Sequence, residues 1–422
     1  MIAIFLFIFV IVRVKSHDLD KYLLESSGNS MIDITNFHLD KNNKYEDVFP
    51  DKKDINDVNP GCFPHTQVYV DSEVISRAES QHNSFSSVLQ GVMRVDSNKY
   101  YANRLCGNIT LSSKLQRIND GVIVWRQNDY SFIHSPRTSL TLGSSRCSPN
   151  QPTPFPPTLT SHMRIIEEAV FDSSAVWAQA YYHSTSEKFF PLALARDILE
   201  SNPNIIIIVE IIPDSLKEQL KLIGIDVSRL LVVDSVKTAV FVKKLYYPTW
   251  LFCGWTSPVI AQGMRNWIQA KNPEVYNTRA QKKTKIIVID RRDRQNGGCS
   301  RCIVNTDEIV TAIKTTYPYF EVDLFLANPS QKLQLSQRDT MNLFSNATMI
   351  IAPHGAALTN FIYAPKGASM IEILNQDPMN PCFMVLARSL ANDYYGISPI
   401  SSQRVNVSKI IDVIKMILLN KE

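Results

Sequence analysis

A short apolar run near the C-terminal end, residues 348–352, limits the fold of this chain more than any other feature. The run is bounded by Pro353 and is typical of a parallel strand buried on both faces. The next four residues, 354–357 (His-Gly-Ala-Ala), predict a tight turn into a helix, and residues 369–374 predict a second strand that carries Glu372. Backbone N–H groups at a helix start bind anions. The pattern therefore predicts a nucleotide-diphosphate site, in which the helix start meets the phosphates and the carboxylate accepts ribose hydroxyls.

Strand and helix patterns alternate along the chain from residue 164 to residue 419, in two blocks. Alternation of this kind predicts two doubly wound α/β domains, with ligands beyond the carboxyl ends of the strands. The expected strands are 68–70, 92–95, 121–125, 164–171, 205–209, 230–233, 239–245, 285–289, 320–326, 348–352 and 369–374. The expected helices are 176–199, 213–222, 259–270, 306–315, 336–345, 384–391 and 408–419.

The N-terminal part predicts passage through the secretory pathway. Residues 2–12 are an unbroken apolar run, shorter than the about 20 residues that span a bilayer. We therefore expect a cleaved signal peptide over 1–16, or alternatively a short anchor. A polar stem over 17–60, an N-terminal α/β domain over 61–250 and a C-terminal α/β domain over 251–422 would follow.

Cysteine usage, glycosylation acceptors and charge agree with this route. The chain has seven cysteines and three Asn-x-Ser/Thr acceptors, at Asn108, Asn346 and Asn406. A net charge of +4 is too small to indicate nucleic acid or a membrane surface as a partner. The expected location is the lumen of the endoplasmic reticulum or Golgi, or the outside of the cell, with membrane contact only through an anchor.

The stretch from His354 to Asn360 (His-Gly-Ala-Ala-Leu-Thr-Asn), followed by residues 371–373 (Ile-Glu-Ile), resembles the signature of glycosyltransferase family 61. That family includes plant β-1,2-xylosyltransferases and luminal O-linked N-acetylglucosaminyltransferases. The chain departs from it at Ala357, where glycine is usual, and the extra methyl narrows the approach of the backbone to a phosphate. The resemblance covers roughly residues 165–400.

The resemblance implies the GT-B fold, in which two Rossmann-like domains face each other across a cleft that holds the active site. It further implies an inverting glycosyltransferase. The C-terminal domain would bind a nucleotide sugar, most readily a UDP-sugar, and the N-terminal domain would present the acceptor. The sugar, N-acetylglucosamine or xylose, stays open, as does the acceptor hydroxyl on a glycoprotein or glycan.

Arginines cluster directly after the expected strand 285–289. Such a cluster is often a solvated turn, but planar guanidinium groups also suit bidentate contact with a diphosphate. The resemblance implies that Arg291, Arg301 and Asn305 contact the diphosphate, and Arg294 is a further candidate. The expected nucleotide-binding residues are therefore Arg291, Arg294, Arg301, Asn305, His354, Gly355, Ala356, Ala357, Thr359, Asn360 and Glu372.

His183 and Glu187 lie four residues apart in the helical pattern 176–199 and so share one face. An exposed ion pair explains this spacing, and so does an imidazole–carboxylate pair built for proton transfer. The resemblance implies the second role, because family members carry a histidine with an acid four residues later. Here the acid is Glu instead of the usual Asp, and Ala180 stands where Asn is often found. We expect Glu187, aided by His183, to be the catalytic base, with His354 as a second candidate.

No metal or other tightly bound cofactor is expected. The Asp-x-Asp pattern that often holds a metal occurs at residues 18–20, beside the signal. Cys299 and Cys302 form a Cys-x-x-Cys pair, but no second pair with metal-ligand spacing lies nearby, so structural disulfides are the expected use.

Three alternatives stay open. The first is a catalytically inactive family member that binds carbohydrate or protein in the lumen, which the departures at Ala180 and Ala357 favour. The second, an oxidoreductase, lacks a Gly-x-Gly-x-x-Gly motif after any expected strand. The third is a disulfide-handling protein that uses Cys299 and Cys302.

Overall fold

The structure is a computed structural model that describes most of the chain from residue 164 onward and short segments before it. The described residues are 46–48, 66–71, 73, 93–96, 99–102, 115–119, 121–127, 130–135, 140–143, 164–172, 179–233, 239–248, 256–276, 285–292, 301–327, 335–375, 380–401 and 403–421. The predicted signal over 1–16 and most of the predicted stem over 17–60 lie outside this set. Within it, no helix has the length and apolar character needed to cross a membrane.

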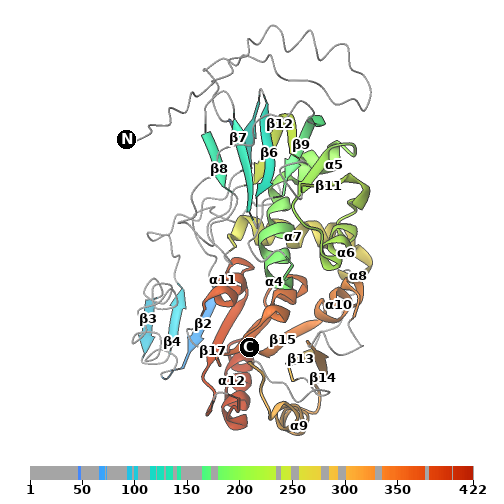
Figure 1. Ribbon diagram of the computed structural model, residues 1–422. Coiled ribbons are helices and arrows are strands. Elements are labelled where there is room, and N and C mark those ends of the chain that lie inside the picture. The colour runs from blue at the N-terminus through green and yellow to red at the C-terminus, as the bar shows by residue number, and fades with distance from the viewer. Residues whose placement is uncertain are drawn as a thin grey trace, which may run out of the picture.

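The first sheet, in the upper part of Figure 1, has the strand order β11-β10-β9-β12-β6-β7-β8, with β5 paired to β12 and β1 to β5. Strands β9 to β12 run parallel, and the others add antiparallel pairs. The strands are β1 (Glu46–Val48), β5 (Leu115–Ile118), β6 (Val122–Gln127), β7 (Tyr130–Ser135), β8 (Leu140–Gly143), β9 (Arg164–Phe171), β10 (Ile206–Val209), β11 (Leu230–Val232) and β12 (Val240–Pro248).

The second sheet has the order β14-β13-β15-β16-β17-β2-β4-β3, and its strands from β14 to β2 are parallel. The strands are β2 (Thr66–Val70), β3 (Met93–Asp96), β4 (Lys99–Ala102), β13 (Lys285–Asp290), β14 (Glu321–Leu326), β15 (Ala347–Pro353), β16 (Ser369–Ile373) and β17 (Asp393–Ile397). Parallel sheets with helices between their strands confirm the predicted α/β class.

Strand β2 differs from the prediction, which placed every residue from 61 to 250 in the N-terminal domain. It pairs instead with β17 in the second sheet. Without β2, β17 would leave a row of backbone groups unpaired at a sheet edge. The pairing is fixed by side chains as well, because the Asp71 carboxylate accepts the N–H of Ser398 at 2.5 Å and the Tyr69 ring contacts Tyr395.

The predicted helix over 176–199 is a helical segment of changing type: α4 (Tyr181–His183), the π-helix η2 (Ser184–Phe189), the 3-10 helix η3 (Phe190–Ala195) and α5 (Arg196–Ser201). Pro191 explains the change, because it has no N–H to donate to residue 187 and its ring crowds that carbonyl. The turn before it widens into a π-helix. Such helices are rare in proteins, and those that occur often lie at functional sites.

The remaining helices are α6 (Asp214–Leu222), η4 (Val227–Arg229), α7 (Pro258–Lys271), α8 (Pro273–Tyr276), α9 (Thr306–Thr316), α10 (Gln337–Phe344), η6 (Ala356–Tyr363), α11 (Cys382–Ser389) and α12 (Val407–Leu419). Of these, α6, α7, α9, α10, α11 and α12 agree closely with the predicted ranges, η4 and α8 were not predicted, and the residues after 354 form the 3-10 helix η6.

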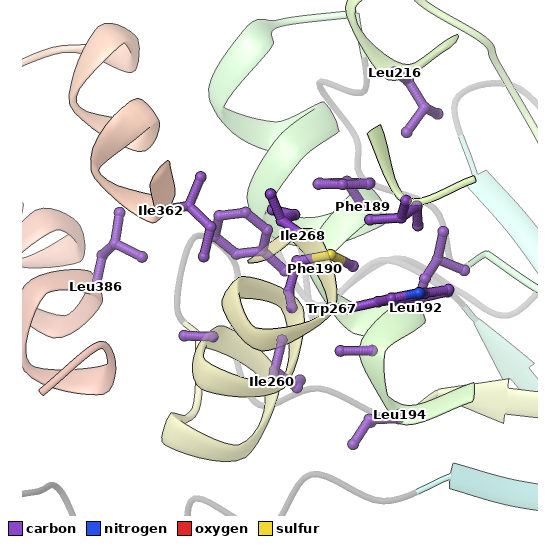
Figure 2. Packing of buried hydrophobic residues seen from close by; sticks show 14 of the residues in the cluster. Phe189, Phe190, Leu192, Leu194, Leu216, Ile260, Trp267, Ile268, Ile362 and Leu386 are labelled. Atoms are coloured by element: carbon purple, nitrogen blue, oxygen red, sulfur yellow. The ribbon is translucent and has the colours of Figure 1, made fainter. Parts of the chain in front are cut away.

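Helix α7 packs between the helices of the two sheets (Figure 2). It begins at Pro258, where the Ser257 hydroxyl accepts the N–H of Ile260 as an N-cap. Its buried residues, including Trp267 at 0% exposure, meet Phe190 of η3 on one side and Ile362 of η6 on the other. One apolar cluster therefore runs from the first sheet to the second, while α9 and α12 cover the opposite face of the second sheet.

Candidate active site

The topology of the second sheet places a ligand crevice between β13 and β15. From β13 the chain passes through α9 to β14 on one side, whereas β15 lies on the other side of β13. The carboxyl ends of two such strands diverge, and ligands of open α/β sheets bind there. Arg291 directly follows β13, and His354 directly follows β15. The fold thus brings together two groups predicted from separate parts of the sequence.

Arg291 and Gly355 are in direct contact at this crevice. The Arg291 guanidinium donates to the backbone carbonyl of His354. A Cβ at residue 355 would lie 2.3–2.9 Å from three guanidinium atoms, so only glycine leaves room for this arginine. Burial and the nearby charge of Arg301 lower the pKa of Arg291 to about 10. The group is cationic at neutral pH but poorly solvated, and an anion bound there would offset that cost.

Replacing Gly355 by alanine is expected to weaken nucleotide binding about 10–100-fold, because the new methyl must displace the Arg291 guanidinium. Isothermal titration with UDP measures the effect. The control is Gly263→Ala within α7, where a Cβ would lie 3.4 Å from the Ala193 side chain and helix propensity improves. Equal affinity of the Gly355 variant and the wild type would contradict the role of this contact.

A cavity of about 710 Å³ opens at this crevice. One wall carries cationic and amide groups, from Arg291, Ala356, Ala357 and Asn360. A second, apolar stretch follows β14 and precedes α10, with Phe325, Leu326, Ala327 and Leu335. The opposite wall comes from the helices of the first sheet, with Gln179, Tyr181, Asp214 and Glu218. The cavity therefore lies between the two sheets and has an anion-binding end and an apolar part.

Helix η6 supplies backbone donors to the cationic wall. The first N–H groups of a helix have no partner within the helix, so those of Ala356 and Ala357 are available where these residues line the cavity. Thr359, by contrast, is fully buried and donates its hydroxyl to the Ala356 carbonyl at 2.6 Å. The Thr359 side chain thus holds the helix start, and the contact of this residue with the nucleotide stays a prediction.

Glu372 is also placed differently from the prediction. Its side chain is fully buried, its Oε1 lies 2.5 Å from His354 Nδ1, and its Oε2 accepts the Tyr394 hydroxyl at 2.6 Å. Both oxygens are bound within the protein, so neither is available to ribose hydroxyls. The physical reason is that β16 lies inside a sheet covered on both faces, where a charge must be paired internally.

The other residues predicted to bind the diphosphate differ in where they lie. Arg301 is exposed and has a left-handed backbone with φ of 57°. Its positive charge contributes to the lowered pKa of Arg291. Arg294 lies outside the described residues. Asn305 is buried, and its amide donates to the Val405 carbonyl at 2.9 Å and accepts the Val405 N–H at 3.2 Å. Asn305 thus joins the loop before α12 to α9, and its contact with the nucleotide stays a prediction.

His183 and Glu187 do share one helical face, as predicted. His183 Nδ1 lies 2.7 Å from Glu187 Oε1, and the Glu187 side chain is 1% exposed, which contradicts a solvated surface pair. Rings connect this pair to the other histidine–carboxylate pair: His183 contacts Tyr182, Tyr182 contacts Phe383, and Phe383 contacts His354, with centroids 5.3, 5.2 and 4.9 Å apart. Both pairs therefore lie at the junction of the two halves.

No sequence pattern predicts the hydrogen bonds that join the two halves beside the cavity. The Gln337 side-chain oxygen accepts the hydroxyls of Tyr181 and Tyr363, both at 3.0 Å, and the Gln219 amide at 3.4 Å. Tyr181 Oη also lies 2.5 Å from Asn360 Oδ1, so its one proton is shared between the two acceptors. Burial raises the pKa of Tyr181, so its hydroxyl keeps its proton. These polar side chains sit on helices that were predicted, but only the packing of helix against helix reveals their contacts.

A second charged cluster lies at the carboxyl ends of β9 and β10. Asp172, Lys188 and Glu210 are each at most 3% exposed, and Lys188 Nζ lies 3.4 Å from Glu210 Oε1. Asp172 has no hydrogen-bond partner for either carboxylate oxygen among the described residues. Burial raises the pKa of Asp172 to about 7, a rise to which Glu210 contributes and which Lys188 opposes. Lys188 thus anchors η2 to the first sheet through Glu210.

Two cysteines fall within the described residues. Cys302 is disulfide-bonded, and its partner lies outside them, whereas Cys382 is a buried free thiol. Burial and the charge of Glu372 raise the pKa of Cys382. A buried thiol with a raised pKa is a poor nucleophile, which disfavours disulfide exchange at this cysteine.

Comparison with known proteins agrees with the geometry. Residues 181–371 match the model of the Glycosyltransferase 61 family. The chain is 29% identical over 165 residues to protein O-linked-mannose β-1,4-N-acetylglucosaminyltransferase 2 of Xenopus laevis. That alignment covers 37% of this chain and 26% of the Xenopus protein, so about a quarter of the relative is represented. The matched region contains His183, Glu187, Arg291 and the turn after β15, and it is similar to glycosyltransferase family 61 domains.

Proposed function

We propose that the protein is a glycosyltransferase of the GT-B type that transfers a sugar from a nucleotide sugar to a hydroxyl group with inversion. The observation that carries this is the cavity at the β13–β15 crevice, where Arg291 lies against Gly355 and the backbone of the His354 turn. Guanidinium and helix-start amides suit a diphosphate. The His183–Glu187 pair lies on the helical segment that continues from the cavity-lining Tyr181, and neither residue of the pair itself lines the cavity.

The donor in this proposal is a UDP-sugar. The diphosphate would bind Arg291 and the amides of Ala356 and Ala357, with Arg301 adding positive charge. The apolar stretch from Phe325 to Ala327 offers a surface for the nucleobase. Because arginines and amides meet the phosphate charge, the transfer proposed here needs no metal ion.

Transfer would proceed by a single displacement. Glu187, held by His183, takes the proton of the acceptor hydroxyl, and the acceptor oxygen forms a bond to the anomeric carbon. The bond from that carbon to the phosphate oxygen breaks with its electron pair, and Arg291 stabilises the developing charge. Attack on the face opposite the leaving group inverts the anomeric centre.

The acceptor proposed is a hydroxyl of a glycoprotein or glycan in the lumen of the endoplasmic reticulum or Golgi. The Xenopus relative is named for adding N-acetylglucosamine to O-linked mannose, which makes UDP-N-acetylglucosamine the first donor to test and UDP-xylose the second.

Thermal unfolding with added nucleotides tests the proposal. UDP at 100 times its dissociation constant is expected to stabilise the protein by about 2.7 kcal/mol, with GDP and NAD less effective and EDTA without influence. Arg291→Ala should abolish the shift. The control Arg338→Ala, which removes an exposed arginine paired with Glu274, should keep it. Absence of any nucleotide effect on the wild type would refute the nucleotide site.

The second candidate is an inactive member that binds carbohydrate or protein, favoured by the departures at Ala180 and Ala357. UDP binding without transfer, over a panel of UDP-sugars and mannose-bearing, N-glycan and peptide acceptors, would select it over the enzyme.

A further inference from the structure

The Glu372 carboxylate binds two side chains in the interior of the second sheet. His354 Nδ1 lies 2.5 Å from one oxygen, and the Tyr394 hydroxyl donates to the other at 2.6 Å. Glu372 and Tyr394 are 0% exposed and His354 is 5% exposed. The three residues come from β16, from β17 and from the turn after β15, which are neighbouring parallel strands. Glu372 and the turn lie at the carboxyl ends of their strands, whereas Tyr394 lies opposite Met370, two positions before Glu372.

This arrangement fixes which nitrogen of His354 faces the protein. An ionised carboxylate can only accept hydrogen bonds, so Nδ1 carries the proton between it and Glu372. Burial and the charge of Glu372 raise the pKa of Tyr394 well above its ordinary value, so the phenol stays protonated and remains a donor. Nε2 is the remaining polar atom of the ring, and no hydrogen bond to it occurs within the described part of the chain.

The ring is also held in place sterically and lies beside the anion-binding wall. The Phe383 ring meets it edge-on, with centroids 4.9 Å apart. The His354 carbonyl accepts the Arg291 guanidinium, and the next residues, Gly355 and Ala356, lead into η6 at the cavity. A histidine placed like this has one free nitrogen, a buried counter-charge and a phosphate site as its neighbour.

We propose that Glu372 and Tyr394 are positioning residues that hold His354 so that Nε2 donates a proton to the departing diphosphate. The inference rests on the proposed function and adds a proton donor to it. As the bond between the anomeric carbon and the phosphate oxygen breaks, its electron pair goes to that oxygen, which takes the proton from Nε2. The acceptor oxygen bonds to the carbon and gives its proton to Glu187. After release of the nucleotide, solvent takes the proton from Glu187 and returns one to Nε2.

Glu372 is suited to this role because its carboxylate lies 2.5 Å from Nδ1 and so fixes the orientation of the ring. Removing the carboxylate partner of a metal-binding histidine typically costs about 10–100-fold in activity, and we expect a loss of the same order for His354. A purely structural role of Glu372 would instead lower stability and leave turnover per folded molecule unchanged.

The test uses the whole protein with Glu372→Gln and with Tyr394→Phe as a milder change. Glu372→Gln is expected to lower kcat about 100-fold with UDP affinity within twofold of the wild type, and Tyr394→Phe to lower kcat several-fold. The control is Tyr246→Phe, which removes a hydrogen bond of the same kind, to Glu168 at 2.9 Å in the first sheet. It should affect stability alone.

A second readout does not depend on transfer. Nitrogen NMR of protein labelled at its eight histidines reports which ring nitrogen carries the proton, and His354→Gln identifies the signal. The wild type should show Nδ1–H at His354, and Glu372→Gln should lose this preference.

The outcomes separate the two proposals. Unchanged kcat and an unchanged His354 signal in Glu372→Gln would overturn the inference while the glycosyltransferase assignment stands. If Glu372→Gln does not fold, Tyr394→Phe decides, and a kcat equal to that of Tyr246→Phe overturns the inference. If the wild type transfers no sugar, the proposed function and the proton donation both fail, and the NMR signal alone judges the positioning of His354.

Discussion

Replacing Glu187 by glutamine is expected to lower turnover about 10²–10⁴-fold, because the acceptor hydroxyl then loses the base that removes its proton. UDP binding should stay unchanged, since Glu187 belongs to the helical segment across from the diphosphate site. The amide keeps the size of the side chain and a hydrogen bond to His183, which lies 2.7 Å away, so η2 should keep its geometry. Initial rates with a UDP-sugar and acceptor, compared with UDP affinity, measure the two effects separately.

The matched control is Glu200→Gln on α5 of the same helical segment. Glu200 forms ion pairs with Arg196 and Lys271 and accepts the Trp267 indole N–H, so its partners lie away from His183. This variant should turn over normally. Near-normal turnover of Glu187→Gln would show that another group, with His354 the next candidate, takes the proton.

Replacing Asp172 by asparagine is expected to stabilise the protein increasingly as the pH rises. Burial raises the pKa of Asp172 from 3.8 to about 7, so the folded state keeps a proton that the unfolded state releases. Folding stability from this group is therefore lost between about pH 4 and pH 7. A shift of this size corresponds to about 4 kcal/mol at 1.36 kcal/mol per pKa unit. The variant, which has no such proton to lose, should match the wild type near pH 4 and exceed it by up to that amount at pH 8.

Urea unfolding of both proteins across this pH range measures the difference, and other titrating groups largely cancel in it. The control is Asp226→Asn. The N–H of Ser228 lowers the pKa of Asp226, so any pH-dependent difference should have the opposite sign. A gap between Asp172→Asn and the wild type that does not grow with pH would show that Lys188 keeps Asp172 ionised throughout.

Local patterns predicted the elements well because the signals for them are local. The β-branched and apolar runs of β10, β13 and β15 fix strands regardless of what lies around them. The spacing of His183 and Glu187 is likewise a property of one helical segment. The position of Arg291 directly after a strand is also a local feature of the sequence. These are the parts of the candidate site that the sequence could predict.

The roles of Glu372 and Asn305 could not be predicted because their partners are distant in sequence. Asn305 bonds to Val405, 100 residues away, and Glu372 bonds to Tyr394 on a strand that had no clear pattern. A carboxylate on a strand suggests a ligand only if one face of the strand is open. Burial of β16 on both faces turns the same carboxylate into an internal partner.

The pairing of β2 with β17 also determines the order in which strands of the second sheet can pair during synthesis. Asp71 and its partner Ser398 are 327 residues apart in the chain. At a synthesis rate of about 5–20 residues per second, residue 71 leaves the ribosome roughly 15–65 s before residue 398. During that time β17 has not yet been made, so β2 has no partner strand in the second sheet and this sheet stays incomplete. The segment made early is thus among the last to dock, which makes an exposed β2 the point where newly made chains are most open to mispairing and to chaperones.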